Sequence, residues 1–244
     1  MDMKISGSGR IAAGEYEDIS VNGAARLGTP IRCRSFHCAG SAHSIGRLNA
    51  QQEIRIAGSA QFDGNTSAQD IRISGSASIY GNCTSTGEMR VSGSLRCSGS
   101  VKGNIIHILG AVHTDRIEGE DVLINGKLTC PDLLNARNIV LKMNGATSKV
   151  GSIGGSSITI YPERYHKIVA HLPLLPKLLR GWGYGDLTVK EVIEGDEIKL
   201  EMVTAKSVIG RSVTIGAGCH IEYVRYTDSL EISPDAKVEH IEQI

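Results

Sequence analysis

Large aromatic side chains and long hydrophobic runs are both scarce in this chain of 244 residues. Phe, Trp and Tyr make up only 4% of it, which excludes a core built mainly from large rings. No stretch approaches the roughly 18 to 20 consecutive apolar residues that span a bilayer, and the start lacks the basic and apolar segments of a signal peptide. We therefore expect a cytoplasmic protein, with the cytoplasmic side of the membrane as a further location.

Net charge and nucleotide motifs are missing as well. Lys+Arg and Asp+Glu number 26 each, so no global field draws the chain to nucleic acid. The segment "GEDVLINGKL" (119–128) has six residues between its glycines and Leu after Gly-Lys, so it fails as a phosphate-binding loop. No Cys/His cluster has zinc spacing. The sequence predicts no catalytic residue, cofactor, metal or small-molecule substrate, and no nucleic-acid partner.

Glycine, in contrast, is abundant, with 29 residues set in a repeat. The phrases "EIRIAGSAQFDGN" (53–65), "DIRISGSASIYGN" (70–82) and "EMRVSGSLRCSGS" (88–100) restate one pattern. Its apolar start recurs every 16 to 18 residues, at Ile19, Phe36, Ile54, Ile71, Met89, Ile106, Val122 and Ile139. A glycine stands four positions after each of the first seven starts, at Gly23, Gly40, Gly58, Gly75, Gly93, Gly110 and Gly126.

The residues between these glycines alternate between apolar and polar, which is typical of strands. A second glycine column, at Gly46, Gly64, Gly81 and Gly99, marks another corner, where glycine accepts a positive φ or a tight bend. Three short strands and three corners in 17 or 18 residues predict one triangular turn of a single-stranded parallel β-helix, a β-solenoid. Stacked turns bury a continuous core. Five cysteines fall on inward positions as small hydrophobes, namely Cys33, Cys38, Cys83, Cys97 and Cys130.

The repeat predicts three parts. Residues 1–161 form a parallel β-helix, and 162–192 form a partly helical insert or linker that contains three of the six prolines. Apolar residues then recur at a spacing of five, and alternation returns. We interpret 193–244 as further β-helix turns, either continuous with the first body or forming a second short one.

The residue immediately after a repeat start points outward, and in five turns these residues form a column of cationic or titratable side chains, namely His37, Arg55, Arg72, Arg90 and His107. Glu53, Asp70 and Glu88 precede three of these starts, so the column is either a self-compensating charge ladder or a guanidinium stripe for a partner's carboxylates or for lipid headgroups. The outward histidines His37 and His107 lie four turns apart and cannot meet in one site.

The insert supplies a second candidate partner surface. Lys177, Arg180 and Trp182 lie among leucines in "RYHKIVAHLPLLPKLLRGWGY" (164–184). This composition suits an interfacial membrane segment or a partner-docking arm. The alternative is a flap that packs on the solenoid.

The phrases "IRIAGSA", "IRISGSA" and "MRVSGSL", with "GN" at a later corner, resemble the bactofilins, which are polymer-forming bacterial cytoskeletal proteins. The resemblance covers residues 1 to about 160 well and the tail from 193 weakly. It implies a rod that joins end to end without nucleotide and acts as a scaffold for envelope, motility or shape proteins. The long internal insert and the near absence of tails depart from the family's pattern.

Exposed strand edges at the ends of a solenoid independently predict self-association into a polymer or an oligomer. Two alternatives remain. One is a left-handed β-helix enzyme, a hexapeptide acyltransferase or a γ-type carbonic anhydrase, which only "SVIGRSVTIGAGCHI" (207–221) approaches in style, with His220 as the residue to test. The other is an adaptor that binds a partner without polymerising.

Overall fold

The computed structural model describes residues 1–144, 147–163 and 186–244, and all of their regular structure is β-strand. Strand makes up 76% of the structure and forms a β-solenoid of about 13 turns, so the predicted fold class is confirmed. The chain divides into two compact units, unit 1 (Met1–Glu120) and unit 2 (Asp121–Ile244). The strand β17 (Arg116–Asn125) contains the boundary.

Unit 1 consists of short strands. They are β1 (Met3–Ile5), β2 (Ser8–Ile11), β3 (Gly14–Val21), β4 (Ala24–Leu27), β5 (Ile31–Cys38), β6 (Ser41–Ser44), β7 (Leu48–Ile56), β8 (Ser59–Phe62), β9 (Thr66–Ala68), β10 (Asp70–Ile73), β11 (Ser76–Ile79), β12 (Cys83–Ser85), β13 (Glu88–Val91), β14 (Ser94–Cys97), β15 (Ser100–Ile108) and β16 (Ala111–His113).

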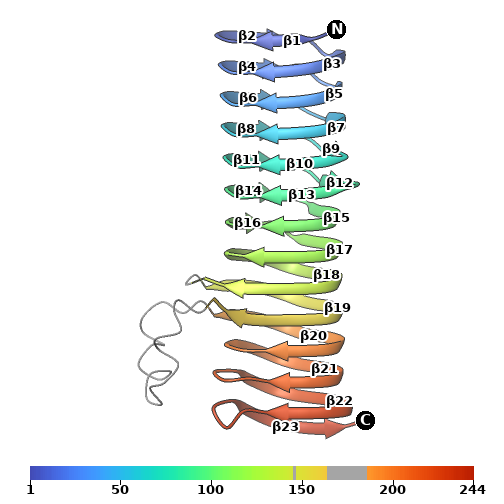
Figure 1. Ribbon diagram of the computed structural model, residues 1–244, viewed down its shortest axis with the longest axis vertical. Helices are drawn as coiled ribbons and strands as arrows, with labels where there is room; N and C mark the ends of the chain where they lie inside the picture. Colours follow the sequence, from blue (N-terminus) through green and yellow to red (C-terminus); the bar gives the residue numbers. More distant parts are fainter. Residues whose placement is uncertain (145–146, 164–185) are drawn as a thin grey trace. The chain divides into compact units, whose positions relative to one another are not determined.

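Parallel pairing arranges these strands into three stacks, which form the three faces of unit 1. The first face contains β1, β10, β13 and the C-terminal halves of β3, β5, β7 and β15. The second face contains β2, β4, β6, β8, β11, β14 and β16, which Figure 1 shows one below another. The third face contains β9, β12 and the N-terminal halves of β3, β5, β7 and β15.

The starts predicted from the repeat form one buried column on the first face. Ile19, Phe36, Ile54, Ile71, Met89 and Ile106 are paired in register from turn to turn, and each is at most 1% exposed. Because every turn places the same position above the last, each apolar side chain packs on its equivalents and contributes roughly 1.5 to 3 kcal/mol of transfer free energy. The rings of Phe36 and Phe62 meet edge to face, with centroids 5.9 Å apart.

The corner glycines are required by close backbone approach. A Cβ added to any of six of them would lie 1.9 to 2.2 Å from the carbonyl oxygen of the glycine one turn earlier; the six are Gly23, Gly40, Gly58, Gly75, Gly93 and Gly110. None of the six has a positive φ. Gly126 differs, because its φ of 144° lies in the region that favours glycine. Six of the seven predicted corners therefore share one cause, and the seventh has another.

An asparagine ladder holds the corner that follows the second face. The backbone N–H of Asn82 donates to Oδ1 of Asn65 at 3.0 Å, and that of Ser100 donates to Oδ1 of Asn82 at 2.9 Å. The side chain of Asn82 also takes the space that a Cβ on Gly99 would need, with Oδ1 at 2.3 Å. The "GN" pair of the repeat is therefore a hydrogen-bonded unit that links successive turns.

Unit 2 uses long strands in place of short ones. After β17 they are β18 (Lys127–Met143), β19 (Ser148–Pro162), β20 (Leu187–Leu200), β21 (Val203–Ile215), β22 (His220–Ile232) and β23 (Lys237–Gln243). Figure 1 shows these strands stacked within the unit. Each pairs in parallel with the next, and the register shifts at one corner in four of the five pairs. These shifts are bulges, which bend a strand without ending it.

The described boundaries differ from the predicted parts. Strand β20 begins at Leu187, inside the range predicted as the insert 162–192, and it pairs with β19 from Ser148 to Ile160. The tail therefore continues the turns that precede it within unit 2. The helical character predicted for the insert falls on residues 164–185, which lie outside the described residues.

Candidate functional site

The described residues hold no group of three or more His, Cys, Asp or Glu side chains that could bind a metal ion. All six cysteines are buried, and none of them forms a disulfide within the described residues. Burial raises the pKa of Cys33 to about 12 and that of Cys219 to about 11, so neither thiol forms the thiolate that nucleophilic catalysis requires. In the parts of the chain described here, no helix has the length and apolar character needed to cross a membrane.

His220, the residue named for the enzyme alternative, lies on the outer surface of β22. Its Nε2 is 3.4 Å from Oε1 of Glu239 and 3.3 Å from Nζ of Lys237, both on β23. The pKa of Glu239 is lowered, first by the hydrogen bond from Lys237 and then by that from His220. The three side chains form an exposed polar row across two turns.

The predicted arginine column exists on the first face, and acidic side chains neutralise it. Arg72 stands in register between Arg55 and Arg90. Oε1 of Glu53 accepts a hydrogen bond from Arg55 at 3.0 Å and forms an ion pair with Nη1 of Arg72 at 3.2 Å, and Oε2 of Glu53 lies 3.3 Å from Nε2 of His37.

Glu88 acts in the same way two turns further along the first face. Its Oε1 lies 2.6 Å from Nε of Arg90 and 3.4 Å from Nδ1 of His107. Asp70 has a different role, because its Oδ1 accepts the backbone N–H of Glu88 at 2.9 Å. We call His37, Arg55, Arg72, Arg90 and His107 the first-face column. Its geometry is that of the charge ladder, which was one of the two interpretations of the sequence.

The remaining predicted partner residues, Lys177, Arg180 and Trp182, lie outside the described residues. Both interpretations of this segment, as an arm and as a flap, therefore stay predictions.

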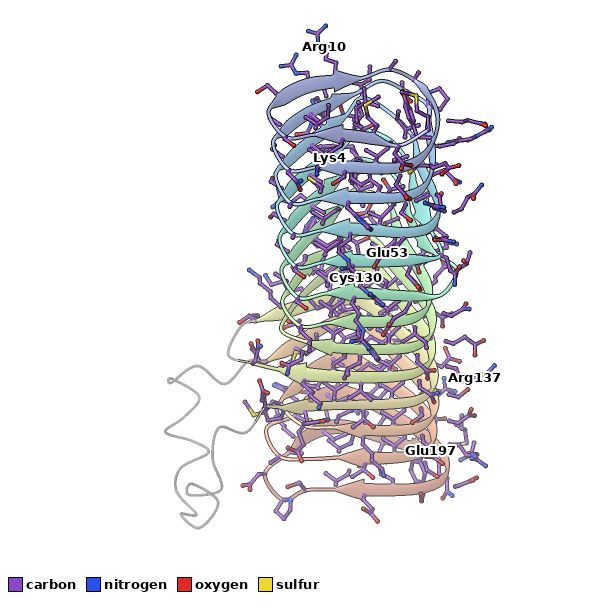
Figure 2. All side chains as sticks on the ribbon, turned by 45° about the horizontal axis from the view of Figure 1, so that its top comes forward. Lys4, Arg10, Glu53, Cys130, Arg137 and Glu197 are labelled. Carbon is purple, nitrogen blue, oxygen red and sulfur yellow. The ribbon has the colours of Figure 1, made fainter. Side chains whose placement is uncertain are left out.

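A second cationic column lies on the second face, and the sequence reasoning missed it. It consists of the residues at one outward register position, Arg10, Arg26, His43, Gln61, Ser78, Arg96 and His113. We call it the second-face column. From Gly23 on, each member stands three residues after a corner glycine, so the repeat alignment already contained the signal. Figure 2 shows Arg10 projecting outward from the first turn.

The N-terminal end of this column borders a shallow hollow. Ser8, Ala24 and Ser41 line it on one side, and Arg10, Arg26 and His43 line it on the other. The small side chains form the floor of the hollow, and the longer side chains of Arg10, Arg26 and His43 project beside it. Of these three side chains, His43 alone has an acidic partner in the described structure, since its Nε2 lies 2.9 Å from Oδ2 of Asp63.

The last turn of unit 2 exposes apolar side chains at positions that are buried in the turns before it. One column runs in register through Leu134, Ile153, Ile193, Val208, Val224 and Ile241. The first five are at most 1% exposed, whereas Ile241 is 54% exposed. Ile232 is 37% exposed, although its register equivalents Ile215 and Leu200 are buried.

No family model matches this chain, and no solved structure matches it. The uncharacterized protein YhbE of Bacillus subtilis strain 168 is 32% identical over 107 residues, which are 44% of this chain and 41% of YhbE. YhbF of the same organism is 30% identical over 112 residues, 43% of this chain and 39% of YhbF. The chain thus covers about two fifths of the length of these relatives.

Proposed function

We propose that this protein is a structural scaffold, a β-solenoid that joins copies of itself end to end without nucleotide and positions other proteins along its faces. The apolar surface of the last turn of unit 2 is the observation that carries this proposal. Four of the nine large hydrophobic residues that are exposed in the described structure belong to β22, β23 and the residue after them; the four are Tyr223, Ile232, Ile241 and Ile244. Contiguous exposed apolar residues mark interaction sites.

The backbone at this end supports the same proposal. Strand β23 pairs with β22 on one edge, and the described residues supply no strand for its other edge. An unpaired edge of a sheet is a template for pairing with another chain. A second copy would satisfy the hydrogen bonds of this edge and cover Ile241 and Ile232 in one step.

The repeated outer surface suits a scaffold. Each turn lies about 4.8 Å from the next, so the side chains at one register position are evenly spaced along a face. The resemblance of the repeat to bactofilins supports the proposal as well and extends it to envelope, motility or shape proteins as partners. The proposal assigns no catalytic step.

Sedimentation velocity of the full chain over a range of concentrations, with and without ATP or GTP, tests the proposal. We expect large species that grow with protein concentration and do not respond to nucleotide. Ile241→Lys should reduce assembly strongly, because it places a charge in the apolar contact. Tyr80→Lys is the matched control, since Tyr80 is 55% exposed on unit 1, and it should assemble as the original chain does.

A chain that stays monomeric at every concentration, or an Ile241→Lys variant that assembles fully, would overturn end-to-end assembly. A monomer that still binds other proteins would indicate the adaptor alternative.

A further inference from the structure

The second face of unit 1 carries cations and small side chains and lacks carboxylates. Its strands present fourteen outward positions, Ser8, Arg10, Ala24, Arg26, Ser41, His43, Ser59, Gln61, Ser76, Ser78, Ser94, Arg96, Ala111 and His113. None of the fourteen is Asp or Glu, so the field of the arginines is not cancelled on the face itself. Asp63 stands at the corner after β8, where its carboxylate already accepts a hydrogen bond from Gln61 and lies 2.9 Å from His43.

The arginines of this face differ from those of the first face in their pairing. Within the described structure, Arg10, Arg26 and Arg96 make no ion pair and no side-chain hydrogen bond. Arg10 and Arg26 are nevertheless in register on adjacent strands, where like charges repel. On the first face, Glu53 and Glu88 relieve the same repulsion. The uncompensated arrangement costs stability, and an external anion would relieve it.

The edges of the second face add an apolar component. Ile45 and Tyr80 follow strands β6 and β11 at one corner and are 62% and 55% exposed, and Arg47 is exposed beside Ile45. Leu109 stands before β16 at the opposite corner and is 56% exposed. The column of outward Ser and Ala side chains therefore lies between the second-face column and Leu109, whereas Ile45 and Tyr80 lie on the other side of the second-face column.

We propose that the second face of unit 1 docks on a membrane surface that carries anionic lipid headgroups. Guanidinium groups and serine hydroxyls would contact the lipid phosphates, and Ile45, Tyr80 and Leu109 would enter the interfacial region. A stack of parallel strands meets a planar leaflet along many turns at once. This surface is distinct from the end of unit 2, so lipid docking does not depend on self-assembly.

The face fits a membrane better than it fits nucleic acid. Its fourteen outward strand positions include no Phe, Tyr or Trp side chain on which an unpaired base could stack. Transfer of the exposed Ile and Leu side chains at the rim into a lipid interface is favourable, whereas their contact with a phosphodiester backbone is not. Duplex DNA is therefore the competing ligand to include in the test.

Binding of the full chain to phosphatidylcholine vesicles with and without phosphatidylglycerol tests the proposal. Each arginine near an anionic surface contributes about 1 kcal/mol, which is about fivefold in affinity. The variant R10Q/R26Q/R96Q should therefore bind anionic vesicles about 100-fold more weakly. The variant R55Q/R72Q/R90Q removes the same number of charges from the first face and should lose less than about fivefold. Both should retain the original circular dichroism spectrum, which shows that each variant is folded when its binding is measured.

Two further arms make the result specific. Ile45→Ser with Leu109→Ser should weaken binding to anionic vesicles and leave the salt dependence unchanged, because it removes apolar contacts only. Repeating the experiment with Ile241→Lys in every variant removes self-assembly, so a failure of docking is distinguishable from a failure of polymerisation.

Three results would overturn the proposal. The first is an original chain that does not distinguish anionic from neutral vesicles. The second is an equal loss in the two triple variants, which would show an effect of net charge alone. The third is a second-face variant that loses affinity for a short duplex DNA while keeping its affinity for vesicles.

Discussion

Units 1 and 2 close the same kind of turn with strands of different length. In unit 1 the chain breaks into strands of three to nine residues, and glycines let one corner press against the carbonyl oxygen of the corner before it. In unit 2 strands of up to 17 residues run around the turn and shifts of register bend them, although one corner keeps the glycine contact, since a Cβ on Gly195 would lie 2.2 Å from the carbonyl oxygen of Gly155. The buried columns are continuous in both units. The glycine phrase is therefore a signature of one type of corner, and a solenoid can continue where the phrase stops.

Replacing Gly58 by Ala should produce the largest effect, because the new Cβ would lie 1.9 Å from the carbonyl oxygen of Gly40 and backbone cannot move aside cheaply. We expect the free energy of unfolding to fall by about 3 kcal/mol or more. Gly7→Ala is the control, since no atom lies within 4 Å of its Cβ position, and it should change stability by less than about 1 kcal/mol. Urea denaturation followed by circular dichroism measures both. Equal stability of the two variants would contradict the carbonyl-contact explanation of the corners.

Removing a rung of the asparagine ladder should have the next largest effect. Asn82→Ala leaves the N–H of Ser100 without its acceptor, and we expect a loss of about 1 kcal/mol in the free energy of unfolding. Asn135→Ala in unit 2 is the comparison, because the side chain of Asn135 makes no hydrogen bond within the described residues, and it should be nearly neutral. Chemical denaturation of both variants in one buffer decides the matter. A loss as large for Asn135→Ala would show that the ladder is not specific to unit 1.

Glu53→Gln tests the compensated column. Glu53 faces two arginines, Arg55 and Arg72, and also His37, so we expect a loss of about 0.5 to 1 kcal/mol in the free energy of unfolding that shrinks as salt is added. Glu15 pairs with Arg32 alone at 3.1 Å, and both side chains are mostly exposed, so Glu15→Gln should be close to neutral. Melting temperatures at low and high salt measure the difference. A salt-independent loss would point to packing and not to charge.

The smallest effect concerns acid stability. The hydrogen bond from Lys102 is the main cause that lowers the pKa of Glu118 below its ordinary 4.5. A carboxyl whose folded pKa is lowered stabilises the fold above its unfolded pKa, and this contribution is lost as the pH falls through the folded value. Glu118→Gln should therefore lower the melting temperature slightly at neutral pH and not at strongly acidic pH. A variant that melts below the original chain by the same amount at both would contradict this linkage.

The repeat made unit 1 predictable because its turns place equivalent residues in register. The starts from Ile19 to Ile106 are the buried column of the first face, and the inward cysteines are buried as expected. The physical reason for the corners was not visible in the sequence. A contact between the Cβ position of Gly58 and the carbonyl oxygen of Gly40 depends on turns that stack directly, which only the structure shows.

The start of β20 inside the predicted insert and the second-face column escaped prediction for different reasons. The corner of β20 between Val189 and Val192 contains a bulge and no glycine, so nothing in the sequence marks that corner. The second-face column was present in the alignment, but the acidic residues next to Arg55, Arg72 and Arg90 drew the interpretation to the first face. Ion pairing with neighbouring carboxylates decides which arginine column is available to a ligand. This pairing depends on the geometry of side chains in successive turns, which the sequence does not show.

Electron microscopy of the pure chain in nucleotide-free buffer tests the scaffold most directly. The account predicts filaments or chains of end-joined solenoids whose length increases with protein concentration and which disappear in Ile241→Lys. Isolated particles of one chain at every concentration, or filaments unchanged by Ile241→Lys, would contradict it.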